Sequence, residues 1–312
     1  MANDDVLTLA RPPQLAAKAS PASLFSFNFL TPEMASEITP ETAALLLKDR
    51  HHNRPMREQV VRGLVGDIVA DRFLLNGATI VLCPEGRLLN GQHRCEAIRR
   101  AGRPVRVFVI LGISPDHRTW ATMDAGAKRT TSDAIAHEGR KHGATTAAIA
   151  RVAVAHVANS FSVHRTTPEL LAFIEANPYL EEISARVVGH NRTVIRGPFG
   201  AVVFLANNKH QLEDEAEAFM DGVLTGANLK VGDPRLTLRN WFAMGRGMST
   251  KRGATTAEQA FTATVRAWNA FVEGREMTTI RLIQLGARIE IIGFSQKAFA
   301  GQNIRIGPRA GV

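Results

Sequence analysis

The chain has 312 residues, of which 45% are hydrophobic and 21% charged, a balance typical of globular proteins rather than disordered or fibrous ones. Its net charge of +9 and pI of about 10.2 favour acidic partners such as nucleotides or nucleic acid. Two cysteines exclude a disulfide framework, and no apolar run approaches the length of a membrane span, so we expect a reduced cytoplasmic protein that crosses no membrane.

The N-terminal part of the chain is predicted to contain an arm and two helices. Residues 1–30 show no sustained hydrophobic period and are predicted to form a flexible arm. Thr39-Pro40-Glu41 is typical of a helix start and predicts a helix that ends near Lys48. Apolar residues recur at helical spacing over 57–72, which predicts an amphipathic helix there.

A strand–turn–helix–strand pattern follows. Residues 79–82 read as a short strand, and 87–89 as its hairpin partner across a Pro-Glu-Gly turn. The Asn90-Gly91 turn then leads into a helix to about Ala101, and residues 105–111 have the largely apolar character of a buried strand.

From about residue 130 the pattern becomes helical. Apolar residues at helical spacing predict helices around 149–157, from 167, over 201–205 and over 257–273. The expected fold class is therefore α+β, with a small mixed-sheet domain over 31–128, an all-helical domain over 129–290 and a tail over 291–312.

The most informative motif is the Asn90-Gly91-Gln92-His93-Arg94 sequence between the second predicted strand and the helix. The first backbone N–H groups of a helix have no acceptor within it, and the helix dipole adds positive potential, so this turn predicts an anion site. His93 and Arg94 are expected to add charge-assisted donors. Eleven basic residues against five acidic ones over 87–141 point to the same phosphate chemistry.

Several motifs together resemble the ParB/sulfiredoxin-like superfamily, and in particular its phage- and plasmid-borne members. The resemblance covers roughly residues 38–135. It is carried by Asn53-Arg54-Pro55, Asn76-Gly77-Ala78-Thr79-Ile80, Leu89-Asn90-Gly91-Gln92-His93-Arg94 and Met123-Asp124-Ala125-Gly126-Ala127-Lys128-Arg129-Thr130. Two positions depart from the pattern of partition proteins, which usually carry Glu-Arg where this chain has Gln92-His93.

The resemblance implies a small mixed-sheet fold whose helix N-terminus holds the phosphates of a nucleoside triphosphate, CTP or ATP, with Mg²⁺. It further implies DNA as a partner and a homodimer in a protein of a mobile element, while CTPase-like turnover and nuclease activity stay open as alternatives. The resemblance matches Gly91, Gln92, His93 and Arg94 to the phosphate turn, and Asn53, Arg54 and Pro55 to the first nucleotide-contacting box. Asn90, Lys128 and Arg129 complete the set of predicted phosphate contacts. Gln92 occupies the position at which sulfiredoxins carry their catalytic cysteine, so sulfiredoxin chemistry is not expected.

Other interpretations stay open at this point. The 124–133 loop could close over a phosphate with Lys128 and Arg129, or simply cap a helix through Thr131 or Ser132. A metal-dependent nuclease using a carboxylate such as Glu96 or Asp124 is an alternative function, and a non-catalytic phage interaction protein is a third. Cys95, which follows the turn, is interpreted as a packed core thiol.

Overall fold

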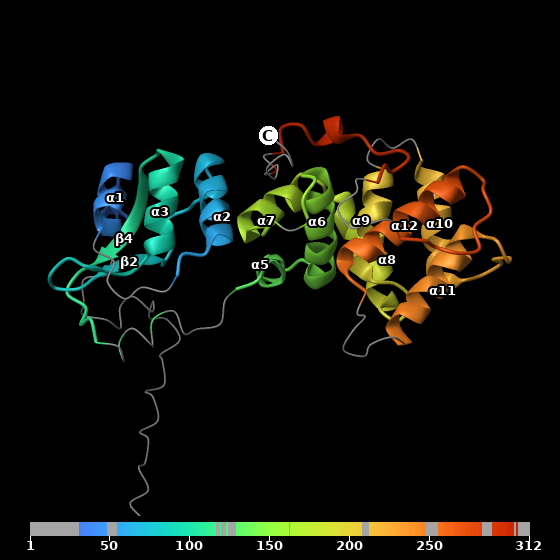
Figure 1. Cartoon of the computed structure of the whole chain (residues 1–312), viewed down its shortest axis with the longest axis horizontal. Coiled ribbons are helices and arrows are strands. Elements are labelled where there is room, and N and C mark those ends of the chain that lie inside the picture. Colours follow the sequence, from blue (N-terminus) through green and yellow to red (C-terminus); the bar gives the residue numbers. More distant parts are fainter. Residues whose placement is uncertain are drawn as a thin grey trace, which may run out of the picture.

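The computed structural model describes residues 31–48, 55–116, 119, 123, 129–161, 163–207, 212–247, 255–282, 289–302 and 304. Within this part, a region with a four-stranded sheet is followed by a largely helical region (Figure 1). The predicted α+β fold class, a small mixed sheet followed by helices, is confirmed. The predicted arm over residues 1–30 lies outside the described residues.

The sheet is mixed and has the strand order β1-β4-β2-β3. Its strands are β1 (Ser36–Ile38), β2 (Thr79–Leu82), β3 (Leu88–Asn90) and β4 (Val105–Ile110). β2 runs parallel to β4, whereas β1–β4 and β2–β3 are antiparallel pairs. The β2–β3 hairpin and the β4 strand were predicted; β1 was not, because three residues are too few to show an alternating pattern.

Three helices pack beside this sheet, α1 (Pro40–Lys48), α2 (Glu58–Val69) and α3 (Gln92–Ala101). α3 lies between the other two and contacts both (Figure 1). Ile80 on β2 and Ile98 on α3 are completely buried in the shared core. The helix predicted over 57–72 and the helix after Gly91 therefore form as expected, because each buries its apolar face against the sheet region.

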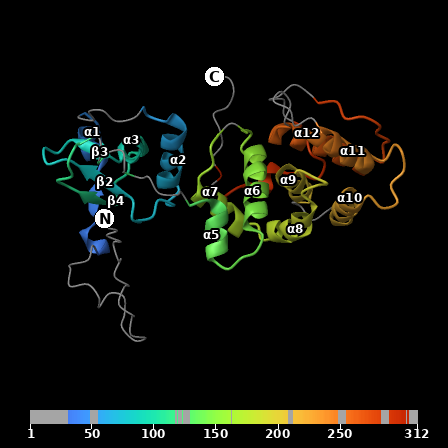
Figure 2. The same cartoon turned by 90° about the horizontal axis from the view of Figure 1, so that it is seen from below.

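The helical region is built around α6 and α9, which pack closely against each other. Figure 2 shows α5, α6 and α7 between the sheet region and the remaining helices. No described helix combines the length and apolarity that crossing a bilayer requires. The helices are α5 (Thr131–His137), α6 (Gly143–Val157), α7 (Thr167–Glu175), α8 (Tyr179–Val187), α9 (Arg196–Ala206), α10 (Glu213–Thr225), α11 (Pro234–Gly247) and α12 (Ala257–Val272), with short 3₁₀ turns at Pro32–Met34, Val188–His190 and Gln296–Phe299.

The start of the predicted tail packs on the helical core. The indole N–H of Trp268 on α12 donates to the Ile292 carbonyl at 2.9 Å. The Gln296 amide donates to the carbonyl of Val157, at the end of α6, at 3.0 Å. We call residues 289–302 the C-terminal segment; its apolar side chains close one side of the helical core, and this burial is what orders it.

A hydrogen bond between described residues joins the two regions directly. The Thr166 hydroxyl, at the start of α7, donates to the Asp67 carboxylate on α2 at 2.8 Å. Asp67 is buried and also accepts from Arg72, so the carboxylate is held in place from both sides. A partly buried polar contact therefore lies at the junction between α2 and α7.

Candidate functional site

The Gly91 turn joins β3 to α3 in a conformation that requires glycine. Gly91 has φ +103°, in the left-handed region, and its N–H donates to the Asn90 side-chain oxygen at 2.7 Å. A Cβ at this position would lie 3.1 Å from the Ile80 Cγ1 and 3.3 Å from its Cα. Glycine therefore lets the start of α3 approach the buried strand β2 closely.

The N-terminus of α3 has the electrostatic character of an anion site. The first intrahelical bond runs from the Cys95 N–H to the Gly91 carbonyl at 3.0 Å, so the amides of residues 92–94 precede it. The first turn of α3, which is described in full, contains no acidic residue. The positive end of the helix dipole is therefore not neutralised by a side chain of that turn.

His93 has a structural contact. Its side chain is buried, with the residue 8% exposed, and its Nε2 accepts a hydrogen bond from the backbone N–H of Arg57 at 3.0 Å. A backbone N–H can only donate, so Nε2 carries no proton in this contact and the imidazole is neutral. His93 thus holds the residue that precedes α2, which differs from the charged donor that the sequence suggested.

Arg94 also turns toward the protein. Its Nη1 donates to the Thr79 carbonyl on β2. The same nitrogen lies 3.5 Å from the position that a Cβ on Gly91 would occupy, so the guanidinium lies close to the turn. Arg94 therefore fastens α3 to the sheet, and its role as a phosphate contact stays a prediction.

A carboxylate neutralises the other arginines of α3. Glu96 accepts from Arg99 at 2.7 Å and from Arg100 at 2.5 Å, and Arg100 also pairs with Glu58 at 2.7 Å. The hydrogen bonds from Arg99 and Arg100 lower the pKa of Glu96 to about 2. This cluster ties α3 to α2, and the two arginines lie on a partly solvated helix face.

Cys95 is a packed core thiol, as predicted. It is completely buried and forms no disulfide. Burial raises the pKa of its thiol to about 11, although the nearby Arg94 acts in the opposite direction. The thiolate fraction at neutral pH is therefore very small, and thiolate chemistry has no support at this position.

The other predicted contacts do not all fall in the described part. Asn53, Arg54 and Lys128 lie outside the described residues. Arg129 is described and exposed, just before α5. Thr130 caps α5 by accepting from the Asp133 N–H, one residue earlier than the expected Thr131 or Ser132.

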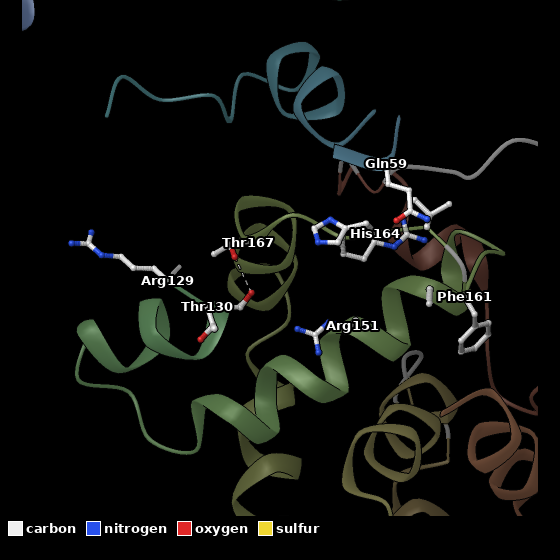
Figure 3. Close-up of a pocket in the computed structure, with 11 residues that line it drawn as sticks. Gln59, Arg129, Thr130, Arg151, Phe161, His164 and Thr167 are labelled. Carbon is white, nitrogen blue, oxygen red and sulfur yellow. Dashed lines mark hydrogen bonds between the residues drawn. The ribbon is translucent and has the colours of Figure 1, made fainter. Parts of the chain in front are cut away.

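Arg129 lines a cavity that the sequence did not indicate (Figure 3). The cavity has a volume of about 490 Å³ and lies where Gln59 of α2 faces the helical region. Arg151 on α6 and His164, before α7, also line it. The available signal was Arg151 itself, the one basic residue amid a long apolar and small-residue run, Ala147 to Ala155, which is otherwise core.

Among the described residues, no group of three or more histidine, cysteine, aspartate or glutamate side chains is arranged to hold a metal ion. The nuclease interpretation thus gains no observation from the described residues. Comparison of the chain with protein-family models, with curated proteins and with solved structures found no match. The resemblance to the ParB/sulfiredoxin-like superfamily stays a prediction made from the sequence motifs.

Proposed function

We propose that this protein is a nucleotide-responsive, DNA-associated protein of ParB type, and that the N-terminus of α3 holds the phosphates of a nucleoside triphosphate. The observation that carries the proposal is the strand–Gly91–helix turn, in which the positive end of α3 begins directly against buried Ile80. The excess of basic residues over 87–141 supports the same class of ligand.

In this proposal the backbone does most of the phosphate binding. The amides of residues 92–94 are the donors, because the His93 and Arg94 side chains already contact Arg57 and Thr79. These side chains are positioning residues, which set the angle between α3, α2 and β2. CTP or ATP would bring Mg²⁺ bound to its own phosphates, which lowers the charge that the turn must balance.

Calorimetry with CTP, ATP and GTP, each with and without Mg²⁺, tests nucleotide binding. We expect at least one nucleotide to bind, and Gly91→Ala to weaken it by at least about tenfold, because the added Cβ pushes α3 away from Ile80. Gly77→Ala is the control, since a Cβ there meets nothing within 4 Å. Asn90→Ala is a milder second variant that removes only the acceptor of the Gly91 N–H. If none of the three nucleotides gives heat, the nucleotide part of the proposal is wrong.

The proposed association with DNA is tested by a separate measurement. Affinity for duplex DNA is measured over a range of salt concentrations, with and without the nucleotide that binds. We expect the affinity to fall linearly on logarithmic axes as salt rises, and to change when nucleotide is added. An affinity that nucleotide leaves unchanged would rule out a responsive protein. Supercoiled plasmid that is nicked in Mg²⁺ or Mn²⁺ would favour the nuclease alternative instead.

A further inference from the structure

The cavity between α2 and the helices α5, α6 and α7 has the size of a small-molecule site. Its volume of about 490 Å³ lies within the range of roughly 300–1,000 Å³ that is common for ligand pockets. In Figure 3, Arg151 of α6 and His164 of the loop before α7 point into the same space from different sides, whereas Arg129 points away.

The charge around this cavity is positive. Three arginines and a histidine are among its described lining residues, and none of those residues is acidic. Arg165 is balanced internally, because it pairs with Glu169 at 3.4 Å and both side chains are 1% exposed. Arg151 makes no hydrogen bond or ion pair with another described residue. Its charge is therefore available to a ligand.

Hydroxyl groups add neutral donors beside Arg151. The hydroxyls of Thr131 on α5 and Thr167 on α7 lie 3.2 Å apart and share a hydrogen bond (Figure 3). In such a pair one proton is used between the two oxygens, and the other hydroxyl proton is left for a third acceptor. A phosphate oxygen in the space next to Arg151 and His164 is an acceptor of the required kind.

The other lining residues suit the remainder of a ligand. Ala155, Phe161 and Val163 give the cavity an apolar side, and the Phe161 ring packs against Phe261 with centroids 5.5 Å apart. Gln59 is contributed by α2, so a ligand here would contact both regions of the molecule.

We infer that this cavity is a binding site for a small phosphorylated molecule with an apolar or planar part. Its phosphate lies against Arg151, His164 and the Thr131–Thr167 pair. Arg129, a phosphate contact predicted from the sequence, lines this cavity, but no residue of the Gly91 turn is among its described lining residues, so the cavity is separate from the turn of the proposed function. A bound ligand would tie α2 to the helical region beside the Thr166–Asp67 contact.

Inorganic pyrophosphate is the probe for the anionic part of this site, with binding followed by calorimetry on the full chain. We expect saturable binding that Arg151→Ala weakens by at least about tenfold and that Arg151→Lys partly retains. Arg151 is exposed on a helix, so alanine there should not disturb the fold. Arg275→Ala is the matched control, because Arg275 is an exposed arginine that pairs with Glu273 and does not line the cavity.

The outcomes separate this inference from the proposed function. Pyrophosphate binding that survives Gly91→Ala but not Arg151→Ala supports the cavity. Binding that is lost in Gly91→Ala and kept in Arg151→Ala places the phosphate at the turn and overturns the inference, as does the absence of saturable pyrophosphate binding. If Arg151→Ala weakens the binding of duplex DNA but not of pyrophosphate, the edge of the cavity contacts nucleic acid and the inference of a small-molecule site is wrong.

Discussion

Several arginine side chains in this protein donate hydrogen bonds to backbone carbonyls within the fold. Arg94 donates to β2, Arg103 donates to the Val69 carbonyl at the end of α2 at 3.0 Å, and Arg239 donates to the Leu224 carbonyl at the end of α10 at 2.8 Å. The contacts of Arg103 and Arg239 satisfy carbonyls that a helix end leaves unpaired. Part of the net charge of +9 is therefore carried by arginines that already use hydrogen-bond donors within the fold.

The Glu96 cluster predicts an acid-sensitive contribution to stability. Because arginines hold its pKa at about 2 in the folded protein, below the ordinary 4.5, its contribution is complete above pH 4.5. The contribution is lost as pH falls from 4.5 toward 2. We expect a loss of about 1–3 kcal/mol, reduced from the full shift because both arginines are partly solvated.

Urea denaturation of the parent and of Glu96→Gln at a series of pH values measures this loss. The variant should be less stable at neutral pH, and its stability should depend less on pH below 4.5. Glu175→Gln is the control, since Glu175 is an exposed acid of α7 with no ion pair among the described residues. If the free energy of unfolding changed equally steeply with pH below 4.5 in the parent and in Glu96→Gln, the prediction would be contradicted.

Helices α6 and α9 cross at a point where glycine sets the distance. A Cβ on Gly200 of α9 would lie 2.5 Å from the Ile149 Cδ1 and 2.8 Å from its Cγ1. We expect Gly200→Ala to lower the free energy of unfolding by about 1–3 kcal/mol, because the buried helix pair has no room to take up a methyl group. Thermal and urea unfolding measure it, with Gly189→Ala, where a Cβ meets nothing within 4 Å, as control. A variant as stable as the parent would show that the crossing can widen freely.

Elements with a strong local pattern could be predicted, and those held by distant contacts could not. The amphipathic period over 57–72 and the Thr39-Pro40 cap are local signals, and α1 and α2 formed accordingly. α8, α10 and α11 were missed although their sequences are amphipathic; α8 and α10 begin without a side-chain cap, so no capping motif marks their starts. For α7, which starts at residue 167 as predicted, the cap is Thr166, whose hydroxyl accepts from the Glu169 N–H.

In the candidate sites, too, local features could be predicted from the sequence and contacts between distant residues could not. The Gly91 turn is one contiguous motif, so its strand–turn–helix geometry could be read from sequence. The directions of the His93 and Arg94 side chains could not, because Arg57 and Thr79 reach them only in the fold. The cavity joins residues as distant as 59 and 167, and no local pattern brings such positions together.

The Thr166–Asp67 hydrogen bond crosses the junction between the two regions. We expect Thr166→Val to loosen it, and hydrogen exchange of the α2 amides near Asp67 should become faster. Thr166→Ser keeps both the hydroxyl and the cap and should behave as the parent. Because Thr166 also caps α7, Thr256→Val is a second control: it removes an equivalent cap on α12 and should leave α2 exchange unchanged. Unchanged exchange at α2 in Thr166→Val would show that the contact does not hold the junction.

The C-terminal segment has a consequence for biosynthesis. It bonds to the end of α6 through Gln296, to α12 through Ile292 and to Asn177, after α7, through Gln302. The partners at the end of α6 and after α7 lie 139 and 125 residues earlier in the chain than the residues they contact, so nascent chains that stop short of residue 289 expose the apolar surface that the segment covers. A chaperone that recognises such surfaces would engage these nascent chains and release them once the segment emerges.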